Sequence, residues 1–192
     1  MMFSIQYRIV LYNYNKFPGE MGYISINCDK LKYGFYFPEG VEVEMLTVRL
    51  WDWFRYLTEL PLLMQENSNV AINDVESDNF WIEFERDDYD TMHMSIVQKD
   101  IRSDKFIIAK KISENKSKVL ERSASCQVEQ MYREIILKAE EYIEDVISLN
   151  PFLKSESQIL SSEQSKLRNE ISTMEQKVRC IRQITDSRNN IV

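Results

Sequence analysis

The chain has 192 residues, and its hydrophobic fraction of 44% is enough to bury a sizeable core and excludes wholesale disorder. The net charge of −7 is uneven: residues 1–100 hold 8 Lys/Arg and 17 Asp/Glu, a net of −9, whereas residues 101–192 hold 16 and 14, a net of +2. A concentrated negative surface repels nucleic acid and anionic membrane and attracts basic partners. The charge therefore predicts a partner protein with a basic surface, and no nucleic-acid partner.

The sequence predicts a cytoplasmic protein. No apolar run approaches the roughly 18–20 residues that cross a bilayer, and residues 1–14 lack the basic start and long apolar stretch of a signal peptide. The three cysteines, Cys28, Cys126 and Cys180, are odd in number and widely spaced. A disulfide framework is therefore not expected.

The first forty residues predict three strands. Residues 3–11 alternate between apolar and polar side chains, a period typical of a strand, and Pro18-Gly19 breaks the chain. Residues 22–28 and 31–37 are again extended and rich in Tyr and Phe. Asp29-Lys30 can turn one into the other, so these two segments predict a hairpin.

A helix is predicted next, over about residues 44–60, lying across the sheet with both of its Trp residues partly buried. Pro61 is expected to end it. The apolar positions at helical spacing are Leu46, Leu50, Trp53, Phe54, Leu57 and Leu60.

Further strands are predicted beyond this helix. A short strand at residues 70–72 precedes a clear strand at 80–85, which a turn at 86–90 joins to a returning strand at 91–96. Residues 106–112 predict one more strand.

Beyond a polar break at residues 113–117 the sequence predicts helices. A wide apolar stripe predicts a helix over about residues 124–149, which Asn150-Pro151 ends. The stripe consists of Val128, Met131, Tyr132, Ile135, Ile136, Ala139, Tyr142, Ile143, Val146 and Ile147.

A last helix, capped by Ser155 or Ser157 and reaching about Asp186, carries a short heptad pattern. We call its core positions the C-terminal seam: Leu167, Ile171, Met174, Val178 and Ile181. In a parallel dimer two of three flanking charge pairs would repel, which disfavours a parallel homodimer. Three arrangements stay open: the helix folds back on the stripe through the short linker 150–154, it self-associates in antiparallel fashion, or it binds a partner's helix.

Together these elements predict an α+β fold with a mainly antiparallel sheet of five or six strands, one crossing helix and two C-terminal helices, the last one long. The expected organisation is an α+β domain over residues 1–151 and a C-terminal helical extension over residues 152–192. The extension either packs on the helix 124–149 or serves assembly.

The strongest candidate site is a strand and turn in which aromatic and acidic residues interleave. We call it the acidic hairpin: Trp81, Glu83, Glu85, Asp87, Asp88, Tyr89 and Asp90. The first three share one strand face, and the aspartates crowd the turn. Large aromatic side chains beside fixed charge make good interface anchors, so these residues form the predicted partner-binding site. A solvated turn and a Trp81 buried in the core are the alternatives.

No catalytic, cofactor or metal site is predicted. The acidic turn lacks the spacing of a calcium loop, the four glycines match neither phosphate-loop nor dinucleotide-binding spacing, and the single histidine, His93, has no triad signature around it. Glu114-x-Lys116 echoes an element of metal-dependent nucleases, but the chain shows no basic groove for nucleic acid. The protein is therefore expected to be non-enzymatic.

Three segments together carry a family resemblance: Leu50-Trp51-Asp52-Trp53-Phe54, the strand and turn at 80–88, and the helix end Ile147-Ser148-Leu149-Asn150-Pro151. In this order they resemble small acidic α+β proteins of bacteria, of the toxin-immunity type. The resemblance covers residues 1–151 and assigns no residue a role, and residues 155–192 depart from it. It implies an inhibitor that occupies a basic site on a toxin or effector. The alternative function class is an assembly or scaffold protein that acts through the C-terminal helix.

Overall fold

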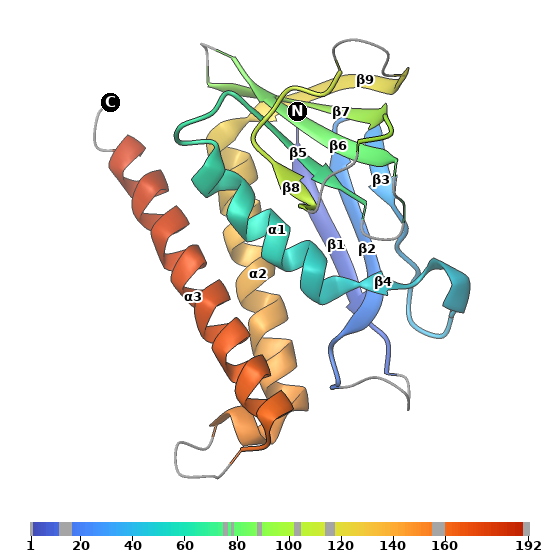
Figure 1. The fold of residues 1–192 in the computed structure, drawn as a ribbon, viewed down its shortest axis with the longest axis vertical. Coiled ribbons are helices and arrows are strands. Elements are labelled where there is room, and N and C mark those ends of the chain that lie inside the picture. Colours follow the sequence, from blue (N-terminus) through green and yellow to red (C-terminus); the bar gives the residue numbers. More distant parts are fainter. Residues whose placement is uncertain are drawn as a thin grey trace.

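The computed structural model describes residues 2–11, 17–74, 77, 79–87, 90–101, 105–113, 118–154 and 160–189, with the backbone alone at 121–123 and 189. It confirms the α+β fold: antiparallel strands form two sheets, one helix crosses them, and two further helices lie on one side (Figure 1). The described strands divide between a sheet of four and a sheet of five, where the sequence predicted one sheet.

The first sheet forms from the alternating N-terminal segments. It consists of β1 (Phe3–Ile9), β2 (Met21–Cys28) and β3 (Leu31–Gly34) in that order, with β4 (Val48–Arg49) paired to the start of β2. The predicted hairpin is confirmed, and its turn holds Asp29 at a φ of 51°, a left-handed conformation that Asp tolerates. The outer edge of β1 is covered, because the Ile5 N–H donates to Glu134 Oε1 on α2 (Val128–Leu149) at 2.9 Å.

The second sheet has the antiparallel order β8 (Ile107–Ile108), β5 (Asn69–Asn73), β6 (Phe80–Arg86), β7 (Thr91–Gln98) and β9 (Lys118–Gln127). The strands predicted at 70–72, 80–85 and 91–96 are confirmed. Of the strand predicted at 106–112, only two residues pair.

Strand β9 is the main correction to the sequence-based assignment. We expected a helix from about residue 124, but residues 118–127 pair with β7 and α2 begins at Val128. The pairing has register shifts between Met94 and Val97, and its buried side chains include the small Ala124 and Cys126. Small residues and a shifted register blur the period of two, so the alternation is not visible in the sequence.

Helix α1 (Leu50–Leu63) starts and ends later than the predicted range of 44–60. A 3-10 turn, η1 (Glu44–Leu46), and β4 precede it. Pro61 does not end the helix. It removes one backbone hydrogen bond, but the Met64 N–H still donates to the Leu60 carbonyl at 3.0 Å, so the helix continues to Leu63. Both Trp51 and Trp53 are buried, as expected for a helix covered on both sides.

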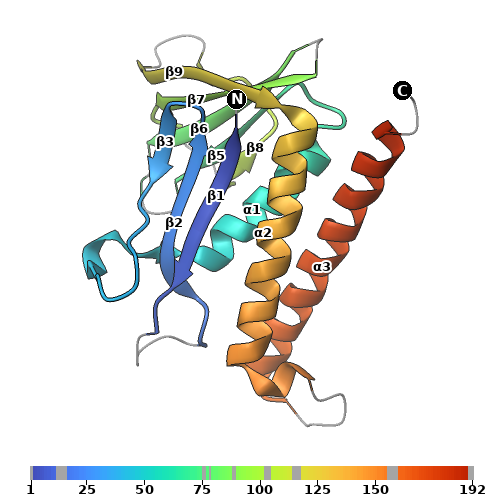
Figure 2. The ribbon, with the colours of Figure 1, turned by 180° about the vertical axis from the view of Figure 1, so that it is seen from behind.

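The two C-terminal helices form a hairpin, which is the first of the three arrangements considered. Helix α2 is followed by the 3-10 turn η2 (Pro151–Lys154) and by α3 (Ser162–Asn189), which lies along α2 and α1 (Figures 1 and 2). The C-terminal seam is 0–5% exposed and joins the main core. The helix is capped by Ser161, whose Oγ accepts the Gln164 N–H at 3.2 Å. The expected caps, Ser155 and Ser157, lie outside the described residues.

The main core draws on both sheets and all three helices. At its centre Phe54 of α1 and Tyr142 of α2 stack with ring centroids 4.3 Å apart. A smaller group lies on the other face of the second sheet, and we call it the outer cluster: Ala71, Trp81, Val97 and Ile112. No helix within the described ranges has the length and apolar composition that crossing a membrane requires.

Candidate functional site

Trp81, the first residue of the acidic hairpin, is a core residue. It is 1% exposed, packs in the outer cluster and donates its indole N–H to the Lys99 carbonyl at 3.1 Å. Both faces of β6 are buried, since Ile82 and Phe84 face the main core. The sequence left open which face of this strand is covered, and Trp81 does not reach the surface.

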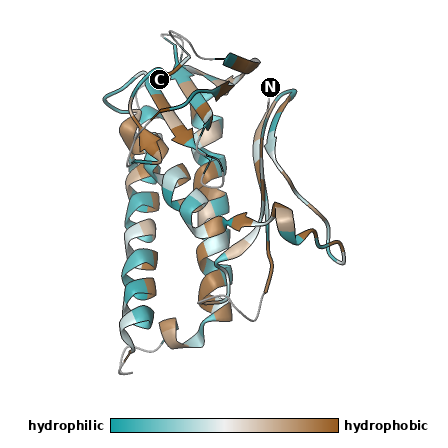
Figure 3. Cartoon of the chain, turned by 45° about the vertical axis from the view of Figure 1, so that its right-hand side comes forward, coloured by the Kyte–Doolittle hydropathy of each residue, from teal (hydrophilic) through white to brown (hydrophobic). Residues whose placement is uncertain are grey.

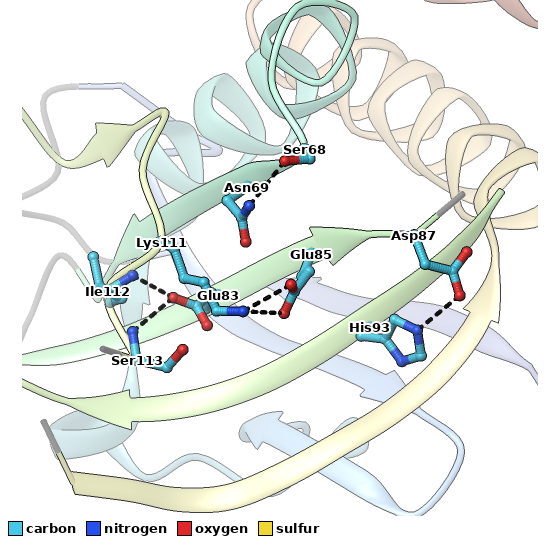
Figure 4. Close-up of polar contacts among 9 residues, drawn as sticks. All are labelled: Ser68, Asn69, Glu83, Glu85, Asp87, His93, Lys111, Ile112 and Ser113. Carbon is cyan, nitrogen blue, oxygen red and sulfur yellow. Dashed lines mark hydrogen bonds and ion pairs between the residues drawn. The ribbon is translucent and has the colours of Figure 1, made fainter. Parts of the chain in front are cut away.

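Glu83 is buried beside it, with 3% exposure. Its Oε2 accepts the backbone N–H groups of Ile112 and Ser113, the latter at 2.9 Å (Figure 4). Charge-assisted hydrogen bonds of this kind are worth about 1.5–3 kcal/mol each. Glu83 therefore holds the segment after β8 against the sheet and closes the outer cluster.

Glu85 lies at the edge of this covered face. Its carboxylate pairs with Lys111 Nζ at 2.7 and 2.9 Å, and the two side chains are 41% and 33% exposed (Figure 4). Burial thus falls along β6 from Trp81 to Glu85. Of the three residues that share this strand face, only Glu85 presents a carboxylate to solvent.

The turn after β6 is organised by Asp87. Its carboxylate accepts the Thr91 N–H at 2.9 Å and lies 3.1 Å from His93 Nε2 (Figure 4). His93, at 35% side-chain exposure, orients this carboxylate. Asp88 and Tyr89 lie outside the described residues, as does the Glu114-x-Lys116 element.

Asp90 ties the turn to both C-terminal helices. It adopts a φ of 59°, its carbonyl accepts the Val128 N–H that begins α2, and its carboxylate pairs with Arg188 of α3 at 2.7 and 2.8 Å. The Arg188 guanidinium also lies 5.6 Å from the centroid of the Tyr132 ring. Burial raises the pKa of Tyr132, whose hydroxyl has no hydrogen-bond partner among the described residues.

The sequence analysis did not predict the basic residues that pair with these carboxylates. Lys111 is 26 residues from Glu85, and Arg188 is 98 residues from Asp90. No local spacing signals such pairs. The acidic hairpin is consequently less negative in space than along the chain, because Lys111 pairs with Glu85 and Arg188 pairs with Asp90.

A cavity of about 520 Å³ lies elsewhere, between the first turns of α1 and α3. Its charged lining has both signs, with Arg49, Arg55 and Lys166 against Glu20, Asp52, Glu163 and Glu170. Asp52 stands 3.4 Å from Arg49 and 3.6 Å from Arg55. With three positive and four negative side chains the lining charges nearly cancel, so the cavity does not favour a strongly charged ligand.

Metal ligands do not gather among the described residues, where no group of three or more His, Cys, Asp or Glu side chains could hold an ion. Compared with known proteins, the chain matches no family model, no curated protein and no solved structure. A function must therefore be argued from the chain's own surface.

Proposed function

We propose that this chain is a non-enzymatic protein-binding module of the inhibitor or immunity type, which occupies a basic site on a partner protein. The observation that carries the proposal is the net charge of −9 in residues 1–100, compared with +2 in residues 101–192. Such a charge distribution speeds the approach of a basic protein and disfavours acidic competitors.

Under this proposal the residues of the acidic hairpin have two roles. Trp81 and Glu83 fix the strand from inside, and Glu85, Asp87 and Asp90 offer carboxylates that are 41%, 32% and 51% exposed. A basic partner would compete with Lys111 and Arg188 for these oxygens. Exposed ion pairs are worth only about 0–1 kcal/mol, so this exchange costs little.

The scaffold alternative finds less support. The C-terminal seam is buried within the chain, and using it for assembly would expose aliphatic side chains at roughly 1.5–3 kcal/mol each. The remaining surface of α3 carries the ion pairs Lys177–Glu59 and Arg182–Glu140, which also serve packing within the chain.

The test is the rate of association with the partner obtained by pull-down from the native host. Neutralising the hairpin with Glu85→Gln, Asp87→Asn and Asp90→Asn should slow association up to about tenfold at low salt. The difference should shrink as salt rises and the Debye length falls to about 8 Å and below.

The matched control is a second triple variant with the same change of net charge. It carries Glu144→Gln, Glu163→Gln and Asp186→Asn, three exposed carboxylates of the C-terminal part. Equal slowing by both variants would mean that total charge alone matters. If the hairpin variant associates at the wild-type rate, the acidic hairpin does not take part in binding.

A further inference from the structure

A short segment projects from the first sheet, on the side away from α2 and α3, and presents apolar side chains to solvent. We call residues 35–46, which leave β3 and end in η1, the arm (Figures 1 and 3). Its exposed apolar residues, with their exposed fractions, are Met45 at 94%, Phe35 at 53%, Val41 at 44% and Tyr36 at 38%. Large apolar side chains grouped on one exposed element mark an interaction surface more often than a scatter of single residues does.

The arm is also acidic. Glu39, Glu42 and Glu44 are all exposed, and residues 33–48 contain no Lys or Arg. The Arg8 guanidinium lies against the backbone of the arm, so the three glutamates leave a net negative charge there. In the acidic hairpin Lys111 and Arg188 pair directly with carboxylates. The arm thus combines the two properties, exposed apolar anchors and excess negative charge, that the sequence indicated for residues 81–90.

The backbone of the arm is held in place by two residues of the first sheet. The Arg8 guanidinium donates to the carbonyls of Pro38, at 2.8 Å, and Val41, and lies 5.0 Å from the centroid of the Tyr23 ring. The Tyr23 hydroxyl accepts the Val43 N–H at 2.6 Å. A segment ordered before binding loses less conformational entropy on binding.

We propose that the arm docks into an apolar groove rimmed by Lys and Arg on a partner protein. The inference rests on the proposed function and names its contact surface. Met45 and the other exposed apolar residues of the arm would fill the groove, and the three glutamates would face the basic rim. Apolar anchors surrounded by a polar rim are the usual anatomy of a protein interface.

The charge of the arm favours this occupant over two others. An anionic membrane would repel the three glutamates. In a two-fold dimer the same patch meets itself, which would bring the glutamates of two arms together. A basic partner satisfies both the apolar and the acidic residues.

The test uses a phage-displayed library of short random peptides as the probe, selected on the full-length chain. Selected peptides should combine large apolar residues with Lys or Arg. Met45→Ser together with Val41→Ser should weaken binding of the best synthetic peptides at least about tenfold. Glu39→Gln, Glu42→Gln and Glu44→Gln should weaken it several-fold at low salt and less at high salt. Leu137→Ser, which changes an apolar residue of α2 with 48% exposure, is the matched control and should change nothing.

Each outcome bears on a separate claim. If the selected peptides are basic and only the Glu85, Asp87 and Asp90 variants weaken their binding, the arm is not the contact surface, and the proposed function still holds. Peptides without Lys or Arg enrichment would count against both. A dimeric mass in light scattering that Met45→Ser converts to a monomer would make a second copy the occupant and refute a basic partner. Circular dichroism of each variant checks that the fold is kept.

Discussion

The packing of α3 against the rest of the chain gives the sharpest test of the architecture. Ile181 of α3 is fully buried in the main core, and α3 contacts both α1 and α2. An Ile→Ala change at such a site removes buried aliphatic surface and leaves a cavity, at a typical cost of about 2–5 kcal/mol. For a chain of this size each kcal/mol shifts the melting temperature by about 2–4 °C, so Ile181→Ala should melt roughly 4–20 °C lower.

The assay is thermal unfolding followed by circular dichroism, with the molar mass measured by light scattering. Gln176→Ala, on the exposed side of the same helix, is the control and should leave the midpoint nearly unchanged. A helix that packs within the chain loses stability without a change in mass. If Ile181→Ala left the midpoint unchanged, α3 would not belong to the core, and a change in mass alone would restore the assembly hypothesis.

Three further predictions address buried polar groups. Glu83→Ala should destabilise the fold by at least about 1–3 kcal/mol, because the buried Ile112 N–H loses its acceptor and the half-buried Ser113 N–H loses its acceptor too. Glu83→Gln should cost less, and urea midpoints compare the two. Burial raises the pKa of Tyr142 well above its usual value, so the folded state keeps a proton that the unfolded state releases near pH 10. The contribution of Tyr142 to the free energy of unfolding is therefore constant below about pH 10 and falls as the pH rises above it. Urea unfolding across a pH series, with tyrosinate absorbance, measures this fall, and a free energy of unfolding that stayed constant above about pH 10 would contradict it. Thiol titration with a chromogenic disulfide should count only Cys180 promptly in the native protein and all three cysteines in urea, since Cys28 and Cys126 are buried and Cys180 is half-buried; three prompt thiols would contradict this packing.

The elements that the sequence predicted well are those with a strong period. The apolar stripe of α2 and the alternation of β6 and β7 are visible directly in the side-chain spacing, and the structure has a helix and two strands at these residues. The exceptions have local causes. Strand β9 has small side chains and a shifted register, and α1 continues past Pro61 to Leu63 although this residue lacks a backbone donor.

The candidate site was harder to predict, because exposure is a property of the whole fold. The sequence correctly put Trp81, Glu83 and Glu85 on one strand face, but nothing local shows that residues 111–113 fold over it. The basic neighbours of Glu85 and Asp90 come from distant parts of the chain. In the arm, the acidic residues are visible in the sequence, while the exposure of Met45 and Val41 depends on how Arg8 and Tyr23 hold the backbone.

The hydrogen bond that covers the edge of β1 has a consequence for biosynthesis. The Ile5 N–H cannot form this bond until Glu134 has been synthesised, 129 residues further along the chain. At about 5–20 residues per second, a nascent chain carries this strand edge uncovered for roughly 6–26 seconds. An open edge is a template for pairing with another chain. Until α2 emerges, β1 is therefore open to pairing with another chain.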